Sequence, residues 1–181
     1  AAETTGAAEV LEHGDAALQH IGDGGVPVYV GTGREVGGDA GPAADPREVL
    51  RRMGAAGLFG LMYEEAYGGA QVDAMTNLVF AEALSQSTFG GFIITVLVHT
   101  DMASPHLHHA GTREQQAKYM PGITSGRTIT AVAITEPGAG SDVAGLRTTA
   151  RRDGDQWVLD GSKLFITNGV HADLYFIAAK T

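Results

Sequence analysis

The stretch Ala-Ile-Thr-Glu-Pro-Gly-Ala-Gly-Ser-Asp, residues 133–142, decides the fold because it lies just past the junction of two sequence patterns. Before Gly126 the apolar residues recur at helical spacing, and after it they alternate as in strands, with turn pairs at short intervals. The stretch continues an apolar strand expected over residues 128–134, which its proline ends. The following glycines predict a tight turn whose outward backbone amides can cradle an anion. From this turn alone, a plain glycine-rich turn capped by Ser-Asp is the favoured interpretation.

The pattern that precedes this stretch predicts a helical domain over residues 46–126. Pro46 suits the first turn of a helix, with Asp45 as its cap and Glu48 three residues after the cap. Thr112 opens another helix with the same capping-box form, and Pro121 with the following glycine is expected to end it. Between these two, apolar residues at helical spacing predict helices over residues 72–85 and 88–109.

The pattern that follows Gly126 predicts the first part of a β-domain, residues 127–181. Its apolar segments are joined by short turns, which favours an antiparallel meander. The expected fold class is therefore α+β, with an N-terminal all-α helical domain followed by the beginning of an antiparallel β-domain. Residues 1–45, rich in Gly, Ala and Asp, form a separate segment that we expect to be loosely ordered. The strands are expected at residues 128–134, 147–152, 156–160, 163–167 and 173–181.

Composition excludes several classes of function. The formal net charge is −9 and the basic residues are scattered, which argues against a nucleic-acid partner. The sequence has no Cys, so thiolate nucleophiles and Cys-ligated metals are excluded. The longest apolar run, residues 92–98, is too short to cross a bilayer, and we expect a protein without a membrane span that is cytoplasmic. Because the chain stops directly after an apolar strand-like run, we also expect it to be a piece of a longer protein.

Four blocks of sequence resemble the acyl-CoA dehydrogenase family in their order and spacing. They are LRRMGAAGLFGLMYEEAYGG, GTREQQAKYMPGITSG, AITEPGAGSD and GDQWVLDGSKLFITNG, and they lie between about Pro46 and Gly169. The matching regions are the end of that family's N-terminal helical domain and the first strands of its middle β-domain. The resemblance implies a flavoprotein with FAD as cofactor, which oxidises acyl-CoA thioesters to trans-2,3-enoyl-CoA.

The resemblance also implies which residues contact the flavin and the substrate. A strand lines the edge of the flavin ring, with the hydroxyl of Thr135 as a donor. Ser141 contacts the FAD diphosphate and the CoA-bearing substrate, while Gly140 lets the backbone approach closely. The ring of Phe165, where many members have Trp, packs on the isoalloxazine, and the Thr167 hydroxyl faces its reactive nitrogen. The full set of implied cofactor-binding residues is Val132, Ala133, Ile134, Thr135, Gly140, Ser141, Phe165, Ile166 and Thr167.

No residue of this chain matches the catalytic base of the family. In the family it is a Glu of a C-terminal helical domain that the chain does not contain, and Glu136 belongs to a strand end instead. We therefore assign no catalytic residue, and we expect the chain alone to be inactive and to hold FAD weakly if at all. For the full-length chain the resemblance implies an acyl-CoA substrate, electron-transfer flavoprotein as the electron acceptor, and a homotetramer.

Two other kinds of protein stay open. One is a non-catalytic flavin-binding or partner-binding subunit that pairs with a chain supplying the base. The other is a flavin enzyme of the same architecture, such as an acyl-CoA oxidase, a nitroalkane oxidase or a two-component flavin monooxygenase.

Three further groups of residues invite a functional reading, and in each we favour a simpler one. The histidines at 106, 108 and 109 have no acidic partner at ligand spacing, so no metal site is assigned. His99 and Asp101 resemble a base with its orienting carboxylate, but packing and capping are favoured, with a wall of the acyl pocket as the alternative. Trp157 is expected to be a core aromatic of the β-domain.

Overall fold

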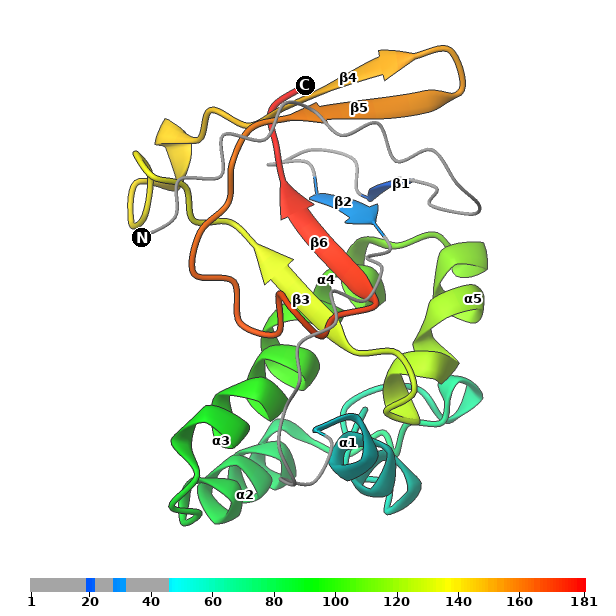
Figure 1. The fold of residues 1–181 in the computed structure, drawn as a ribbon. Helices are drawn as coiled ribbons and strands as arrows, with labels where there is room; N and C mark the ends of the chain where they lie inside the picture. Colours follow the sequence, from blue (N-terminus) through cyan, green and yellow to red (C-terminus); the bar gives the residue numbers. More distant parts are fainter. Residues whose placement is uncertain (1–18, 22–27, 32–45) are drawn as a thin grey trace.

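The computed structural model describes residues 19–21, 28–31 and 46–181. Helices gather on one side of the molecule and strands on the other (Figure 1), so the predicted α+β class is confirmed. Asp45, the predicted cap of the first helix, lies outside the described residues. No helix among the residues described has the length and apolar character needed to span a bilayer. The helical elements are α1 (Pro46–Ala55), η1 (Glu65–Tyr67), α2 (Ala74–Ser85), α3 (Gly90–Leu97), η2 (Val98–Ala103), α4 (Ser104–Ala110), α5 (Arg113–Thr124) and η3 (Val143–Gly145).

Two predicted helix starts are confirmed, and the helices expected from residues 72 and 88 begin at Ala74 and Gly90. Helix α1 begins at Pro46 as expected. The Thr112 hydroxyl accepts a hydrogen bond from the Gln115 amide at 3.2 Å, and the Gln115 side chain accepts one from the Thr112 amide at 2.8 Å. This reciprocal capping box satisfies two N–H groups that the first turn of α5 leaves without helical partners.

The predicted helix over 88–109 is divided in three. Its middle part, η2, is a π-helix between α3 and α4. Side-chain hydroxyls compete for the backbone carbonyls there: Ser104 donates to the carbonyl of His99 at 2.6 Å, and Thr100 donates to that of Val96 at 3.1 Å. Such bonds explain why apolar spacing alone, which predicts one continuous helix, missed the wider turn.

The predicted end of α5 at Pro121 is wrong, because the helix continues through this proline to Thr124. The Thr124 hydroxyl donates to the carbonyl of Tyr67 at 2.6 Å, and the Ser125 hydroxyl donates to that of Pro121 at 2.7 Å. These bonds hold the last turn, and Ile123 in it is buried in the core. The cost of the proline is thereby offset by tertiary contacts that the sequence pattern does not reveal.

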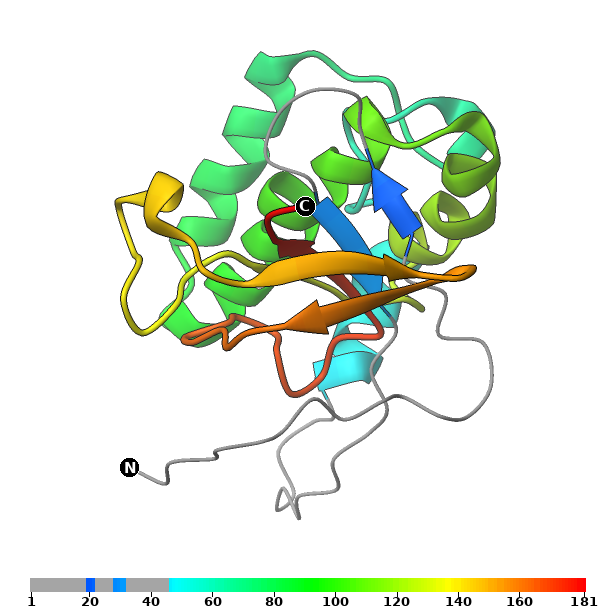
Figure 2. The same ribbon diagram turned by 90° about the horizontal axis from the view of Figure 1, so that it is seen from above.

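The described strands form a sheet and a separate hairpin. The order in the sheet is β1-β2-β6-β3, and β4 pairs antiparallel with β5. Seen from above, the hairpin crosses the end of β6 (Figure 2), and the Ala150 amide donates to the carbonyl of Lys180 at 2.7 Å. The strands are β1 (Gln19–Ile21), β2 (Val28–Gly31), β3 (Thr130–Ala133), β4 (Thr149–Asp153), β5 (Gln156–Asp160) and β6 (Leu174–Ala178).

The β-region differs from an antiparallel meander in two respects. Strand β3 pairs parallel with β6, in register from Thr130 opposite Leu174, and the long connection between them carries the hairpin. Residues 163–167, predicted as a strand, form none, because the backbone at Phe165 turns into the left-handed region with φ of 55°. In addition, the segment expected to be loosely ordered contributes β1 and β2, and β2 pairs antiparallel with β6.

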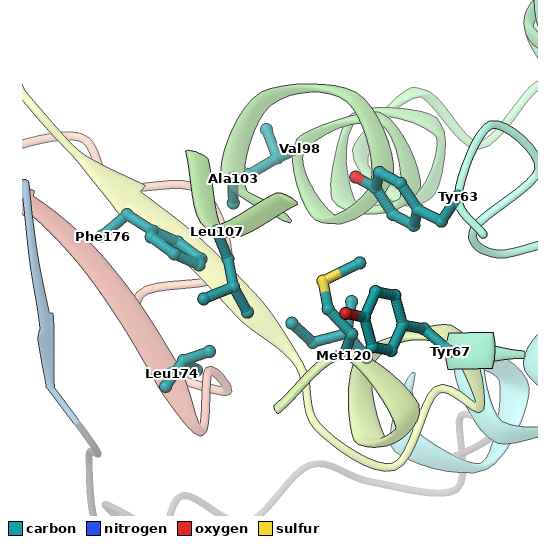
Figure 3. Packing of buried hydrophobic residues seen from close by; sticks show 9 residues of the cluster. Tyr63, Tyr67, Val98, Ala103, Leu107, Met120, Leu174 and Phe176 are labelled. Carbon is teal, nitrogen blue, oxygen red and sulfur yellow. The ribbon is translucent and has the colours of Figure 1, made fainter. Parts of the chain in front are cut away.

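The main core lies between the helices and one face of β6. Leu174 and Phe176 project from β6 toward the helices, and Leu107 lies between them and Met120 (Figure 3). All four side chains are buried. Trp157 belongs to a smaller cluster under the hairpin, where it is partly buried against Ala150 and Ala179. The sheet and the helices therefore share one apolar interior, which fixes the position of β3 and of the residues that follow it.

Candidate functional site

The first predicted flavin segment, residues 132–135, consists of the end of β3 and the two residues that follow it. Ala133 is buried, while Val132, Ile134 and Thr135 are half-buried. Among the described strands β3 lies at the edge of the sheet, so one side of this segment has no neighbouring strand. An edge strand with partly exposed side chains leaves backbone groups and side chains available to a ligand.

The glycine-rich turn after this segment is closed by Glu136. Its amide donates to the carbonyl of Ala139 at 2.8 Å, and the Ala139 amide donates back at 3.2 Å. Its carboxylate accepts the amides of Arg147 at 2.6 Å and of Thr148 at 2.9 Å. A single buried side chain thus joins the two ends of the loop that carries Ser141.

Lys163 connects this loop base to the second predicted flavin segment. Its ammonium donates to the Glu136 carboxylate at 2.8 Å and to the carbonyl of Ile134 at 2.9 Å. Next to it, the Leu164 amide donates to the carbonyl of Thr135 at 2.9 Å. The structure therefore brings residues 134–136 and 163–164 side by side, although the strand predicted over 163–167 is absent.

The Glu136 carboxylate is ionised in this setting. Burial alone raises the pKa of a carboxyl group, but hydrogen bonds from Lys163 and from the amides of Thr148 and Arg147 outweigh that effect and lower the pKa of Glu136 to about 2. The resulting ion pair is nearly dry, since the side chains of Lys163 and Glu136 keep only 11% and 5% of their exposure.

The aromatic residue of the second segment is held away from the core. Phe165 is 91% exposed, and its φ of 55° is uncommon for a bulky residue. The chain returns to the core at Asn168, whose φ is 66° and whose side-chain amide donates to the carbonyls of Thr95 at 3.1 Å and Thr130 at 3.0 Å. A strained backbone that presents an uncovered ring is typical of a binding position.

Several groups around these segments suit a bound flavin. Within the described part of the chain, the hydroxyls of Thr135, Ser141 and Thr167 have no hydrogen-bond partner. A Cβ added at Gly138 or at Gly140 would meet no atom within 4 Å, so the backbone of the turn is open. Flavin carbonyls and phosphate oxygens accept hydrogen bonds from such groups, and the exposed Phe165 ring offers an apolar contact. The residues present therefore fit the cofactor that the resemblance implies.

The predicted site residues do not all meet. Ile134 and Thr135 contact the segment that leads to Phe165, Ile166 and Thr167 through the bonds of residues 163 and 164. Ile166 and Thr167 are half-buried. Gly140 and Ser141 are exposed on the loop, and among the described residues no hydrogen bond joins them to residues 165–167. A ligand that touches all three groups must span the distance between the loop and the two segments.

Glu136, Lys163 and Asn168 are functional candidates that the sequence analysis missed. The sequence gives two signals for this ion pair. One is a Glu next to the proline that ends an apolar strand, and the other is a Lys before an apolar run. Both residues read equally well as solvated strand ends, and only the fold shows that they are neighbours. The Asn-Gly pair at 168 and 169 predicted a turn, but not the two carbonyls that the Asn side chain reaches.

His99 and Asp101 do not form a base with its orienting carboxylate. The Thr130 amide donates to Nδ1 of His99 at 3.2 Å, so Nε2 carries the proton and donates to the carbonyl of Ile123 at 3.1 Å. Burial lowers the pKa of His99 to about 4, and the imidazole is neutral. Asp101 instead accepts from Thr100 at 2.6 Å and from the Asn77 amide at 2.8 Å. The packing interpretation is the one that the structure supports for His99.

A cavity of about 260 Å³ lies away from the predicted flavin residues. It opens between the loop that follows α1 and the helices α2, η2 and α4, and Tyr63, Asp101 and His108 line it. None of the nine predicted cofactor residues belongs to its wall. Within the described ranges no three His, Asp or Glu side chains are grouped closely enough to hold a metal ion, those of 106, 108 and 109 included.

Both halves of the chain match domain models of the same protein family. Residues 39–127 match the family model described as acyl-CoA dehydrogenase, N-terminal domain, and residues 131–181 match the one described as acyl-CoA dehydrogenase, middle domain. The long-chain specific acyl-CoA dehydrogenase of mouse mitochondria is 44% identical over 137 residues, which are 75% of this chain and 31% of the mouse protein.

Solved structures show the same arrangement. An acyl-CoA dehydrogenase from Geobacillus kaustophilus is 41% identical, with a TM-score of 0.72, over 76% of this chain and 36% of that one. An acyl-CoA dehydrogenase from Bacillus anthracis, complexed with FAD, is 38% identical, with a TM-score of 0.71, over 75% of this chain and 23% of that one. The chain spans about a third or less of the length of these relatives.

Proposed function

Because this chain belongs to the acyl-CoA dehydrogenase family, we propose that it forms the N-terminal part of an FAD-dependent enzyme that oxidises an acyl-CoA thioester to the trans-2,3-enoyl-CoA. FAD is the cofactor of the family. The observation that carries the proposal for this chain is the contact between residues 134–136 and 163–164, next to an uncovered Phe165 ring and two hydroxyls without partners.

In this reaction the substrate loses a proton from its α-carbon and a hydride from its β-carbon. FAD, when bound, supplies the acceptor for the hydride. The residues of this chain would hold the cofactor: the hydroxyls of Thr135 and Thr167 would donate hydrogen bonds to it, and the exposed Phe165 ring would offer an apolar contact that keeps water away. The base that takes the α-proton comes from another part of the enzyme, because the buried Glu136 already holds Lys163 and two backbone amides.

The loop 137–146 serves the charged parts of cofactor and substrate in this proposal. Gly140 exposes its backbone, and the Ser141 hydroxyl would donate a hydrogen bond to the FAD diphosphate and lie in contact with the CoA-bearing substrate. Two observations support this role: the loop is exposed at its tip, and Glu136 fixes both of its ends.

We also propose that the complete enzyme is a homotetramer that passes its electrons to an electron-transfer flavoprotein. Support for an extensive contact comes from large apolar side chains that are exposed on α2, on α3 and between these helices. Such a pattern marks surfaces covered by other protein. The exposed apolar residues are Met75, Leu78, Val79, Phe89 and Ile94.

The cytoplasmic location predicted from the sequence stays a prediction.

A chimeric enzyme tests the proposed function. Residues 46–181 replace the matching segment of the mouse long-chain enzyme, which supplies the remaining domains, and flavin reduction by acyl-CoA is followed without oxygen. We expect the chimera to bind FAD and to form the enoyl-CoA, and Thr167→Val to slow flavin reduction about tenfold or more. A folded chimera that binds no FAD would contradict the proposal. Rapid reoxidation of its reduced flavin by oxygen would favour an oxidase instead.

A further inference from the structure

We propose that Glu136 and Lys163 are positioning residues of the flavin site, which set the spacing of its three parts. The parts are the end of β3 at Thr135, the loop that carries Ser141, and the segment of residues 165–167. The inference rests on the proposed function for its ligand, but the contacts that carry it belong to the protein alone. Neither residue touches the cofactor in this scheme, and both act through the backbone that they hold.

Glu136 is the point where the first two parts are joined. Its backbone follows Thr135 directly, and its carboxylate accepts the amides of Arg147 at 2.6 Å and Thr148 at 2.9 Å. The ten residues 137–146 between these points contain η3, and most of them are exposed. The position of Ser141 relative to Thr135 therefore depends strongly on where the Glu136 carboxylate holds the far end of the loop.

Lys163 joins the third part to the first. Its ammonium reaches both the Glu136 carboxylate at 2.8 Å and the carbonyl of Ile134 at 2.9 Å. It stands two residues before Phe165 and four before Thr167, in a segment without strand pairing. Together with the hydrogen bond from the Leu164 amide to the Thr135 carbonyl, this ion pair fixes the distance between the Phe165 backbone and the end of β3.

The chemistry of the pair favours positioning over simple stabilisation. A nearly dry ion pair loses much of its Coulomb energy to desolvation, and a well-packed apolar pair would hold a core equally well. Here the carboxylate accepts three N–H donors, Oε2 from Arg147 and Oε1 from Thr148 and Lys163, which no apolar side chain can do. Neither residue of the pair belongs to an apolar cluster. The pair instead joins the segment of Thr135 to the segment of Thr167, whose hydroxyls have no hydrogen-bond partner in the described part of the chain.

The test uses four variants of the 181-residue chain. Glu136→Gln presents an NH₂ group to a site built from donors, Lys163→Met removes the ammonium but keeps its length, and Lys163→Arg keeps the charge. Asp153→Asn is the matched control, since it breaks the exposed Arg151–Asp153 pair, 3.8 Å long, on the neighbouring hairpin. Amide hydrogen exchange and FAD-induced NMR shifts are measured on each variant.

The two readouts separate the contacts from their consequence for the ligand. Glu136→Gln should speed amide exchange about tenfold or more at Arg147, Thr148 and Leu164, while Lys163→Met should do so mainly at Leu164. Both variants should reduce at least fivefold the initial slope of the amide shifts against FAD concentration. Lys163→Arg should stay within twofold of the unaltered chain in that slope, and so should Asp153→Asn.

Each result either supports the positioning role or overturns it. If FAD-induced shifts in folded Glu136→Gln and Lys163→Met match those of the unaltered chain, the pair is structural only and the inference is wrong. Should Glu136→Gln fail to fold, the comparison of Lys163→Met with Lys163→Arg decides in the same way. If the unaltered chain shows no FAD-induced shifts, the same variants are compared by FAD titration of the chimera, and equal affinities in Glu136→Gln, Lys163→Met and the unaltered chimera overturn the inference. A folded chimera that binds no FAD overturns the proposed function instead.

Discussion

Replacing Phe165 by glycine should separate stability from flavin binding. The ring is 91% exposed, so the change removes only about 20 Å² of buried apolar surface, or about 0.5 kcal/mol. Glycine relieves the left-handed backbone at φ 55°, a gain of about 1 kcal/mol, and loses about the same through the greater freedom of the unfolded chain. The free energy of unfolding should therefore stay within about 1 kcal/mol of its original value.

The same change should cost much more in flavin affinity. A flavin that covers about half of the ring would bury about 100 Å² of it, worth about 2.5 kcal/mol, so the dissociation constant for FAD should rise roughly 70-fold. Urea unfolding followed by the fluorescence of Trp157, the single tryptophan, gives the stability, and an FAD titration of the chimera gives the affinity. Phe165→Trp, which keeps an aromatic ring, is the control and should bind as well as the unaltered protein.

Two results would show that Phe165 plays a different role. A loss of more than about 2 kcal/mol in unfolding free energy would mean that the ring packs against the core. An unchanged FAD affinity in the glycine variant would mean that the ring does not contact the flavin.

Three more predictions concern the parts that support the site. Because the pKa of His99 is about 4 in the folded protein against 6.5 ordinarily, the unfolded chain binds its proton first, and unfolding free energy should fall by about 3 kcal/mol between pH 6.5 and pH 4. Urea titrations across that range should show a shallower fall in His99→Gln, and equal slopes would contradict the assignment. Gly54→Ala should cost about 3 kcal/mol in the same assay, since its Cβ would overlap the backbone of Ser125, whereas Gly91→Ala, in open space on α3, should gain about 0.5 kcal/mol. Asn168→Ala should lose about 2 kcal/mol with its two hydrogen bonds and its tolerated left-handed backbone, and Asn168→Gly should recover about half; equal losses in the two variants would exclude the backbone contribution.

Local rules predicted the elements whose cause is local. The capping box at Thr112 and the start of α1 at Pro46 follow from side chains a few residues apart, and the structure confirms both. Residues 156–160, with alternating pattern and a turn on each side, form β5 as expected. The helix over Ala74–Ser85 ends where its pattern ends. In each case the residues that determine the start or end of the element lie close to one another in the sequence.

Long-range contacts decided what the sequence pattern missed. Pro121 stays inside α5 because Thr124 bonds to Tyr67, 57 residues away. The parallel pairing of β3 with β6 depends on a connection that carries a hairpin, and no spacing rule reveals it. At the site, β-propensity favoured a strand over 163–167, whereas Lys163 is tied to Glu136 and the backbone at Phe165 adopts the left-handed region. Such departures from local preference concentrate at binding positions.

We propose that the flavin of the complete enzyme lies between the end of β3 and the segment of residues 165–167. Titrating FAD into the isotopically labelled chain, with every amide followed by NMR, tests it most directly. We expect the largest shifts on residues 132–135, 140–141 and 165–167, and we expect them to shrink in Phe165→Gly. Shifts centred instead on the cavity beside Tyr63 and His108 would contradict it.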